Sequence, residues 1–262
     1  MKIGACCDLT DTTVPVAEVA RALEDAGLES FTVTQRIHVP ASRADLLAEP
    51  GHEMDANGLD PFVSLTTAAA ATSRIKIGTA AVYPALLDPI VLAKQVASLD
   101  VVSGGRFLFG ITPGWLEEEI AAHGVDPPTR WKVMREKVLA MKELWTADVA
   151  SFDGEFVHLP PVKVGLRPLQ KPHPPILVGS NGPHGLARAL EYGDEWFPMV
   201  SLESLDAMPQ PLPIKTTGFT WGLDAELARR CEQMGFERLL FYLYPDSRGA
   251  LDSWLESVPR RG

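Results

Sequence analysis

The sequence predicts an α/β fold of the (β/α)8 TIM-barrel class, formed by a single domain over residues 1–262. Eight short apolar runs have the continuous hydrophobicity of parallel strands that are buried on both faces. Stretches with helical periodicity follow most of these runs, as crossover helices would. A chain of 262 residues is also the size of one barrel. Together these observations favour a closed barrel over an open sheet.

The predicted strands are short apolar runs bounded by turn residues. In chain order they are 3–7, 31–34, 75–82, 106–111, 176–178, 196–200, 214–217 and 239–243. The predicted helices carry apolar residues at helical spacing: 15–26, 61–71, 89–102, 116–123, 130–145, 186–192, 224–234 and 248–258. Gly27 and Gly104 follow two of these helices, where glycine commonly ends a helix.

Three connections depart from a regular barrel. Residues 35–58 after the second strand form a polar stretch that is too long for a simple connection. After the fourth strand and its helices, residues 151–175 are rich in proline and contain Asp153-Gly154, which predicts an excursion with a hairpin. Residues 201–213 have room for two helical turns at most, so the unit after the sixth strand is shortened. We expect a second subunit to cover that flank, which predicts a homodimer.

Composition and charge exclude several classes of protein. There are 24 Lys and Arg against 34 Asp and Glu, a net charge of −10, with no basic stripe for a nucleic-acid backbone. Apolar runs stay well below the ~18–20 residues of a membrane span. The start of the chain has no signal-peptide pattern, and the three cysteines fit neither a disulfide framework nor a metal site. We therefore expect a cytoplasmic protein with no metal, membrane or nucleic-acid partner.

Short motifs recur along the chain in a characteristic order. They are 59–62 (LDPF), 75–79 (IKIGT), 88–89 (DP), 93–95 (AKQ), 97–100 (ASLD), 103–107 (SGGRF), 114–115 (GW), 143–145 (ELW), 152–154 (FDG), 172–176 (PHPPI) and 193–196 (GDEW). Up to about Pro198, the chain resembles the luciferase-like monooxygenase superfamily and, within it, the flavin- or deazaflavin-dependent oxidoreductases. The resemblance implies that coenzyme F420, a deazaflavin, or alternatively FMN binds at the carboxyl ends of the strands, together with a small-molecule substrate.

The resemblance also implies cofactor-binding residues. It places a non-prolyl cis peptide after the third strand, at Ala80–Ala81, where the alternative is plain strand. Gly179, Ser180 and Asn181 lie between the fifth strand and a helix, an arrangement that presents N–H groups and a positive dipole to a phosphate. The alternative there is a glycine-rich turn in which Asn181 caps the helix.

Several relatives carry an acidic residue and a histidine after the second strand, where this chain has Gln35-Arg36. An arginine stays protonated and makes a poor base, so we assign Arg36 to an anionic part of the cofactor. His38 is a candidate replacement for the missing imidazole, with a solvated loop histidine as the alternative. Tyr83, just beyond the predicted cis peptide, is a second catalytic candidate, as a proton donor or a stacking residue.

Thr112 stands where the commoner family pattern has glycine, and we place it at the cofactor. Trp115 stands where some deazaflavin enzymes have a catalytic glutamate; we place it in the substrate pocket, with packing at a helix start as the alternative. Cys6 and Cys7 point to opposite faces of the first strand, and we place Cys7 in the substrate pocket.

The anionic groups of F420 require a local basic rim on a chain of net charge −10. Candidate rim residues are Arg36, His38 and Arg43 from one loop and Lys171 and His173 from another. The leading hypothesis is hydride transfer between F420 and a small organic substrate. The alternatives are an FMN-dependent monooxygenase and a non-catalytic barrel that retains the pocket.

Overall fold

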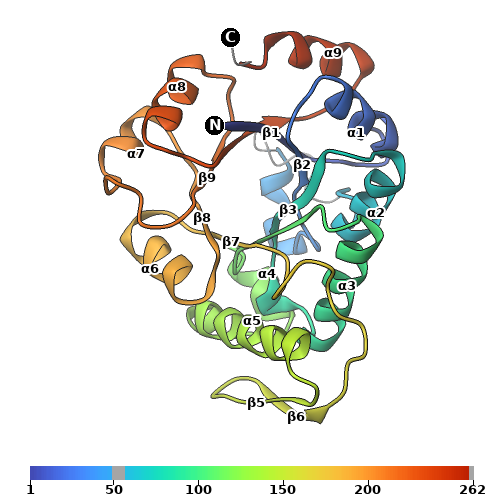
Figure 1. The fold of residues 1–262 in the computed structure, drawn as a ribbon, viewed down its shortest axis with the longest axis vertical. Helices are drawn as coiled ribbons and strands as arrows, with labels where there is room; N and C mark the ends of the chain where they lie inside the picture. The colour runs from blue at the N-terminus through green and yellow to red at the C-terminus, as the bar shows by residue number, and fades with distance from the viewer. Residues whose placement is uncertain (49–56, 260–262) are drawn as a thin grey trace.

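The computed structural model describes residues 1–48 and 57–259, which form a barrel of eight parallel strands surrounded by helices (Figure 1). The strands are β1 (Lys2–Cys7), β2 (Ser30–Val33), β3 (Lys76–Val82), β4 (Phe107–Ile111), β7 (Ile176–Gly179), β8 (Glu195–Phe197), β9 (Thr217–Thr220) and β10 (Arg238–Leu243). Their order is β8-β7-β4-β3-β2-β1-β10-β9. Backbone bonds from Trp196 N to Lys215 O and from Phe219 N to Pro198 O, 2.8 and 3.0 Å long, join the two ends of this order. The predicted TIM barrel is confirmed.

The outer ring consists of helices that pack their apolar faces on the strands. They are α1 (Val16–Asp25), α2 (Pro61–Ala71), α3 (Pro89–Val102), α5 (Arg130–Thr146), α6 (Gly182–Tyr192), α8 (Ala225–Gln233) and α9 (Arg248–Ser257). Local chemistry sets several starts. Asp60 and Asp88 accept hydrogen bonds from the first turns of α2 and α3, and each is followed by proline at the first helical position.

The insertions after the second and fourth strands are both present. The first contains η1 (Ala41–Ala48), and residues 49–56 of the predicted polar stretch lie outside the described residues. The second contains α4 (Glu117–Ala122), η3 (Pro127–Thr129) and the predicted hairpin, in which β5 (Ala150–Asp153) pairs with β6 (His158–Val162) at the edge of the molecule (Figure 1).

The sixth unit is shortened as predicted, because its helix α7 (Leu202–Asp206) has five residues. The seventh strand differs from the prediction. The sequence placed it at 214–217, but β9 begins at Thr217, where the register with β10 pairs Thr217 with Arg238. The apolar residue Ile214 suggested that the strand starts earlier. Ile214 instead precedes the strand, and its partly buried side chain packs against the main hydrophobic core.

Side chains along each strand alternate between the barrel interior and the helices. Cys6, Leu108, Leu177 and Leu240 come from four different strands and form one buried cluster inside the barrel. The interior is therefore packed, and open space remains at its ends.

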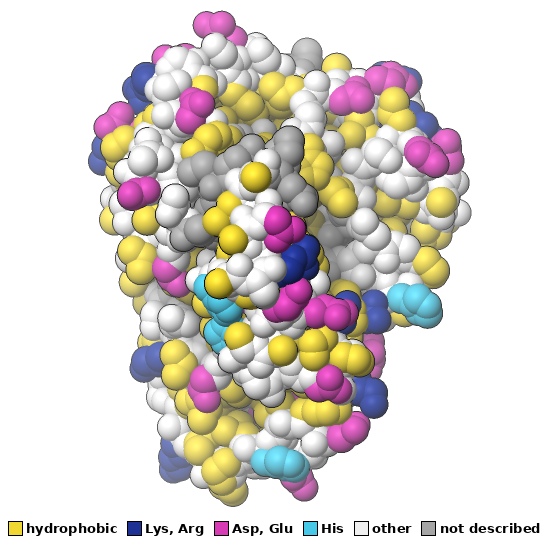
Figure 2. Space-filling model, turned by 180° about the vertical axis from the view of Figure 1, so that it is seen from behind, with side chains coloured by type: hydrophobic (Ala, Val, Ile, Leu, Met, Phe, Trp, Pro, Cys, Tyr) yellow, Lys and Arg dark blue, Asp and Glu magenta, His cyan; other side chains and the backbone are white. Residues whose placement is uncertain are grey.

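The segment after β2 lies at the far end of the barrel in Figure 1, so Figure 2, seen from behind, shows the end where the strands finish. Positive and negative side chains are interspersed on that face.

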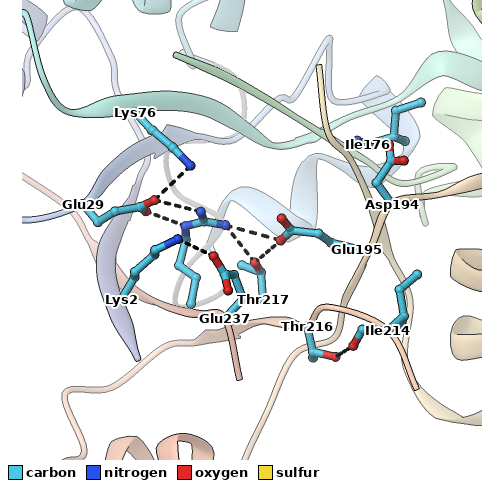
Figure 3. Close-up of polar contacts among 11 residues, drawn as sticks. Lys2, Glu29, Lys76, Ile176, Asp194, Glu195, Ile214, Thr216, Thr217 and Glu237 are labelled. Atoms are coloured by element: carbon cyan, nitrogen blue, oxygen red, sulfur yellow. Dashed lines mark hydrogen bonds and ion pairs between the residues drawn. The ribbon is translucent and has the colours of Figure 1, made fainter. Parts of the chain in front are cut away.

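The opposite end of the barrel is closed by a buried arginine. The Arg238 side chain is 1% exposed, and its Nε and Nη2 donate to the two carboxylate oxygens of Glu29 at 2.6 and 2.9 Å. Its Nη1 donates to Thr217 Oγ1 at 3.0 Å and lies 3.4 Å from Glu195 Oε2. Lys76 adds a second cation beside Glu29 (Figure 3).

These partners also set the ionisation of Glu29. Burial raises the pKa of Glu29, but the hydrogen bonds and charge of Arg238 and the charge of Lys76 outweigh it, so the pKa lies below the ordinary value. The cluster joins the amino ends of β3, β8, β9 and β10 to the residue that precedes β2.

We predict that Arg238→Met destabilises the protein by about 3–5 kcal/mol, because it leaves two carboxylates without their buried partner. Urea denaturation at neutral pH measures this loss. The stability that Glu29 gains is present above the ordinary carboxyl pKa and disappears as pH falls through the lowered value, so the two proteins should converge in acid. Arg229→Met, at an exposed pair with Glu226, is the control and should leave the urea midpoint nearly unchanged. Equal losses in both variants would contradict the assignment.

Candidate active site

A cavity of about 500 Å³ opens at the carboxyl ends of the strands. The last residues of β3, β7, β8 and β9 and the segments after β4, β7 and β8 line it, as expected for a barrel active site. Seven of the residues singled out from the sequence lie together in its wall: Ala80, Ala81, Thr112, Trp115, Gly179, Ser180 and Asn181. The remaining four, which are Arg36, His38, Tyr83 and Cys7, are not part of this wall.

The part of the wall next to β3 is built by close backbone contact between β3 and β4. The Ala80–Ala81 peptide bond is cis, as the resemblance implies. Thr79 Oγ1 donates to the carbonyl oxygen of Gly110 at 2.7 Å, and a Cβ atom at Gly110 would lie 2.0 Å from Thr79 O. Only glycine fits at this approach.

The placement of Cys7 in the pocket is wrong. Cys6 belongs to the cluster inside the barrel, and its Sγ lies 3.7 Å from the carbonyl oxygen of Ala80. Cys7 faces outward and is buried in the core between strands and helices. Successive side chains of a strand point alternately into the barrel and toward the helices, so an error of one residue assigns the wrong cysteine to the interior. Burial raises the pKa of both thiols, so they stay protonated.

The segment of the wall between β7 and α6 leaves the start of α6 without a side-chain cap. Asn181 precedes α6, but its side chain does not cap the helix, since its Oδ1 accepts a bond from Met199 N at 2.9 Å. The amides of the first turn therefore lack a side-chain cap, and Gly182 has the positive φ of 68° that favours glycine. The capping alternative for Asn181 is thus wrong, and the end of the helix remains available to an anion.

Arg130 contributes a further donor that the sequence reasoning missed. It lies at the start of α5 and lines the cavity, with its Nη1 bound to the carbonyl oxygen of Pro127 at 2.7 Å. Its Nε is buried and has no hydrogen-bond partner. Among the described residues in this wall, Arg130 is the one with a charged side chain. A buried N–H group without a partner is costly, so this donor is suited to an anionic ligand.

Arg36 has a different role from the one predicted. Its Nη1 lies 3.0 Å from Glu119 Oε2, and these side chains are 8% and 0% exposed. Glu119 also accepts hydrogen bonds from the backbone N–H groups of Ile37 and His38. The guanidinium lies 5.0 Å from the ring of Trp115, which is 46% exposed and lines the cavity. Arg36 therefore holds the loop after β2 and Trp115 in place.

The two catalytic candidates from the sequence lie outside the cavity wall. The ring of His38 packs against that of His123, with centroids 5.4 Å apart. Tyr83 is buried, and its backbone N–H donates to the side chain of Gln35 at 2.9 Å. Their catalytic roles stay predictions, which this geometry does not favour.

Three polar residues at the ends of β1, β2 and β10 form a cluster that the sequence reasoning also missed. Asp8 accepts hydrogen bonds from the Thr34 hydroxyl and, at 2.8 Å, from the Tyr242 hydroxyl. Burial and the negative charge of Asp8 raise the pKa of Tyr242, so the phenol keeps its proton. Trp221 contacts both Tyr242 and Phe219, which lines the cavity. Strand alternation places Tyr242 on the same face as interior Leu240, and this pattern could have identified it.

The predicted basic rim does not form. Lys171 and His173 precede β7, so parallel strands place them at the opposite end of the barrel from Arg36. Arg43 pairs with Glu118 instead of facing the cavity. Within the described residues, no group of three or more His, Cys, Asp or Glu side chains could hold a metal ion. In the same part of the chain, no helix has the length and apolar character that crossing a membrane requires.

Residues 10–214 match the family model described as luciferase-like monooxygenase. The chain belongs to the luciferase-like monooxygenase family. An uncharacterized protein from Mycobacterium tuberculosis is 39% identical over 187 residues, which are 70% of this chain and 66% of that protein. The F420-dependent glucose-6-phosphate dehydrogenase of Kineococcus radiotolerans is 31% identical over 68% of this chain and 50% of its own length.

The FMNH2-dependent dimethylsulfone monooxygenase of Pseudomonas putida is 33% identical over 49% of this chain and 36% of its own length. The matched part of this chain therefore spans less than two thirds of the length of each of these three relatives. Two solved structures share its fold. An F420-dependent secondary alcohol dehydrogenase has a TM-score of 0.78 at 19% identity, with 98% of each chain covered. A long-chain alkane monooxygenase has a TM-score of 0.77 at 11% identity, with 98% of this chain and 90% of that one covered.

We predict that Glu119→Gln destabilises this protein by about 3 kcal/mol, because it removes the buried carboxylate charge that lies 3.0 Å from the guanidinium of Arg36. Chemical denaturation measures the loss, and tryptophan fluorescence should report a changed environment at Trp115. The matched control is Glu118→Gln on the same turn. Its side chain is 41% exposed and pairs with Arg43, so the loss should stay below ~1 kcal/mol. The role of Glu119 is refuted if the control is as damaging.

Proposed function

We propose that this chain is an oxidoreductase that transfers a hydride between coenzyme F420 and a small organic substrate. The observation that carries the proposal is the cavity wall in which the buried Nε of Arg130 lacks a partner and Asn181, directly before α6, does not cap the first turn of that helix. Both features suit a phosphate. F420 and FMN each carry one, so the wall fits this class of cofactor.

The choice of F420 over FMN rests on the extent of the sequence matches. The F420-dependent relative matches 68% of the chain, whereas the FMNH2-dependent relative matches 49%. The second candidate function, an FMN-dependent monooxygenase, is supported by the 33% identity of that shorter match. When bound, either cofactor supplies the electronic chemistry of the reaction.

The protein would supply binding and orientation. Arg130, Ser180 and the start of α6 would hold the phosphate, and Ala80, Ala81, Thr112 and Gly179 would face the rest of the cofactor. Apolar Trp115 and Phe219 reduce the access of water to the cavity.

A homodimer is also part of the proposal, but through a different face from the one first expected. Helices α2 and α3 expose several apolar side chains to solvent, among them Val63, Val91 and Val102. A helix that is apolar on all sides is normally buried, so this surface is the better candidate for contact with a second copy.

We predict that the purified protein binds F420 in the micromolar range and at least tenfold more tightly than FMN. Fluorescence titration with each cofactor measures the two affinities. Anaerobic change of F420 absorbance with alcohols and sugar phosphates, and oxygen uptake with reduced FMN, then distinguish the two reactions. Preference for FMN with oxygen uptake would replace the first proposal by the second. Binding of neither cofactor would contradict both and favour the non-catalytic barrel.

We also predict that the phosphate site responds to charge. Arg130→Met should weaken FMN binding at least tenfold and leave riboflavin, which has no phosphate, unchanged, because a charge-assisted hydrogen bond contributes about 1.5–3 kcal/mol. Ser180→Asp should weaken FMN binding by repulsion between like charges. Arg135→Met on an exposed part of α5 and Ser253→Asp on α9 make the same charge changes away from the cavity. The assignment fails if the controls match the variants, or if riboflavin responds as FMN does.

A further inference from the structure

A second cavity, of about 510 Å³, lies between α6 and α7 on the flank of the barrel. Its apolar wall includes Leu186, Trp196, Pro198 and Met208. Such a volume lies within the range of small-molecule sites, which is about 300–1,000 Å³. It exists because α7 has five residues and cannot fill the space that a full crossover helix would occupy beside α6.

This flank cavity adjoins the cavity at the carboxyl ends of the strands. Asn181 and Met199 line both. They form the partition between the two spaces, since Asn181 Oδ1 accepts a hydrogen bond from the backbone N–H of Met199 at 2.9 Å. The Met199 side chain is exposed, and a methionine adapts its shape readily to a neighbouring ligand.

The side chains of the flank cavity favour an uncharged occupant. None of the described residues that line it has a charged side chain, so the cavity offers no counter-charge to a phosphate or a carboxylate. Its polar groups already bond within the protein. Trp196 Nε1 donates to Ser180 O at 2.8 Å, and Ser204 Oγ accepts from Ser201 N at 2.8 Å and donates to Ser201 O. What remains for a ligand is apolar contact.

We propose that the flank cavity binds the aliphatic end of the substrate while the reactive end lies in the cavity at the carboxyl ends of the strands. The inference rests on the proposed function, because it concerns the substrate of that site. The substrate then has two parts, a polar group that undergoes the reaction and an uncharged hydrocarbon chain. An anionic tail of a cofactor does not fit this space.

The test uses the whole protein, with and without cofactor, and straight-chain primary alcohols from butanol to dodecanol. Displacement of the uncharged dye Nile red reports their affinities. Each added methylene should tighten binding about fourfold until the cavity is filled, after which the affinity levels off. Ala207→Phe, in the cavity wall, should weaken decanol binding at least tenfold and leave butanol unchanged. Leu202→Phe adds the same ring elsewhere on α7 and should change neither.

If Ala207→Phe folds poorly, Leu186→Gln tests the same wall with a polar side chain of similar size and should also weaken decanol binding. Affinities that do not rise with chain length, or that ignore both substitutions, overturn the proposal. A dimer in light scattering that Ala207→Phe converts to a monomer overturns it too, because the flank would then be a contact between copies. Cofactor titration of the same samples shows separately whether the proposed function holds.

Discussion

The barrel depends on one buried guanidinium. Arg238 satisfies Glu29, Glu195 and Thr217 at once, and each of these lies at the amino end of a different strand or directly before it. Buried charges of this kind are tolerated only when every partner is present, so the cluster fixes the register of these strands together. Because the amino end is closed in this way, the carboxyl end is free to carry open space and polar groups without loss of the barrel.

Polar groups at the carboxyl end divide into those that hold the structure and those that remain available. The sequence suggested that Arg36 and Asn181 bind ligands. In the structure, Arg36 forms an ion pair with Glu119, and the side chain of Asn181 accepts a hydrogen bond from the backbone of Met199. In the described part of the cavity wall, Arg130 Nε has no hydrogen-bond partner, and the nearby start of α6 has no side-chain cap. A net charge of −10 is therefore compatible with an anion site, because the hydrogen-bond donors and positive charge close to a site affect the binding of an anion more than the net charge of the whole chain does.

The sequence predicted the order of the elements well because buried parallel strands and amphipathic helices have distinct periods. It also located most of the cavity wall, since residues after parallel strands meet at one end. It failed where one residue of register mattered, as with Cys6 and Cys7, and where a loop was assigned to the wrong end, as with Lys171 and His173. Arg130 could not be found from the pattern, because nothing in a helical period shows that the start of α5 reaches the cavity.

The short sixth unit is tolerated for a reason that the barrel itself supplies. A missing helix would normally expose the strands on either side and weaken closure between β8 and β9. Here the closure rests on backbone hydrogen bonds between residues 196–200 and 215–219, and on the bond from Thr217 to Glu195 beneath Arg238. Since α7 contributes little to this closure, its loss of length does not open the barrel. The space beside α6 can therefore persist as a cavity, and the constraint at the amino end is what permits it.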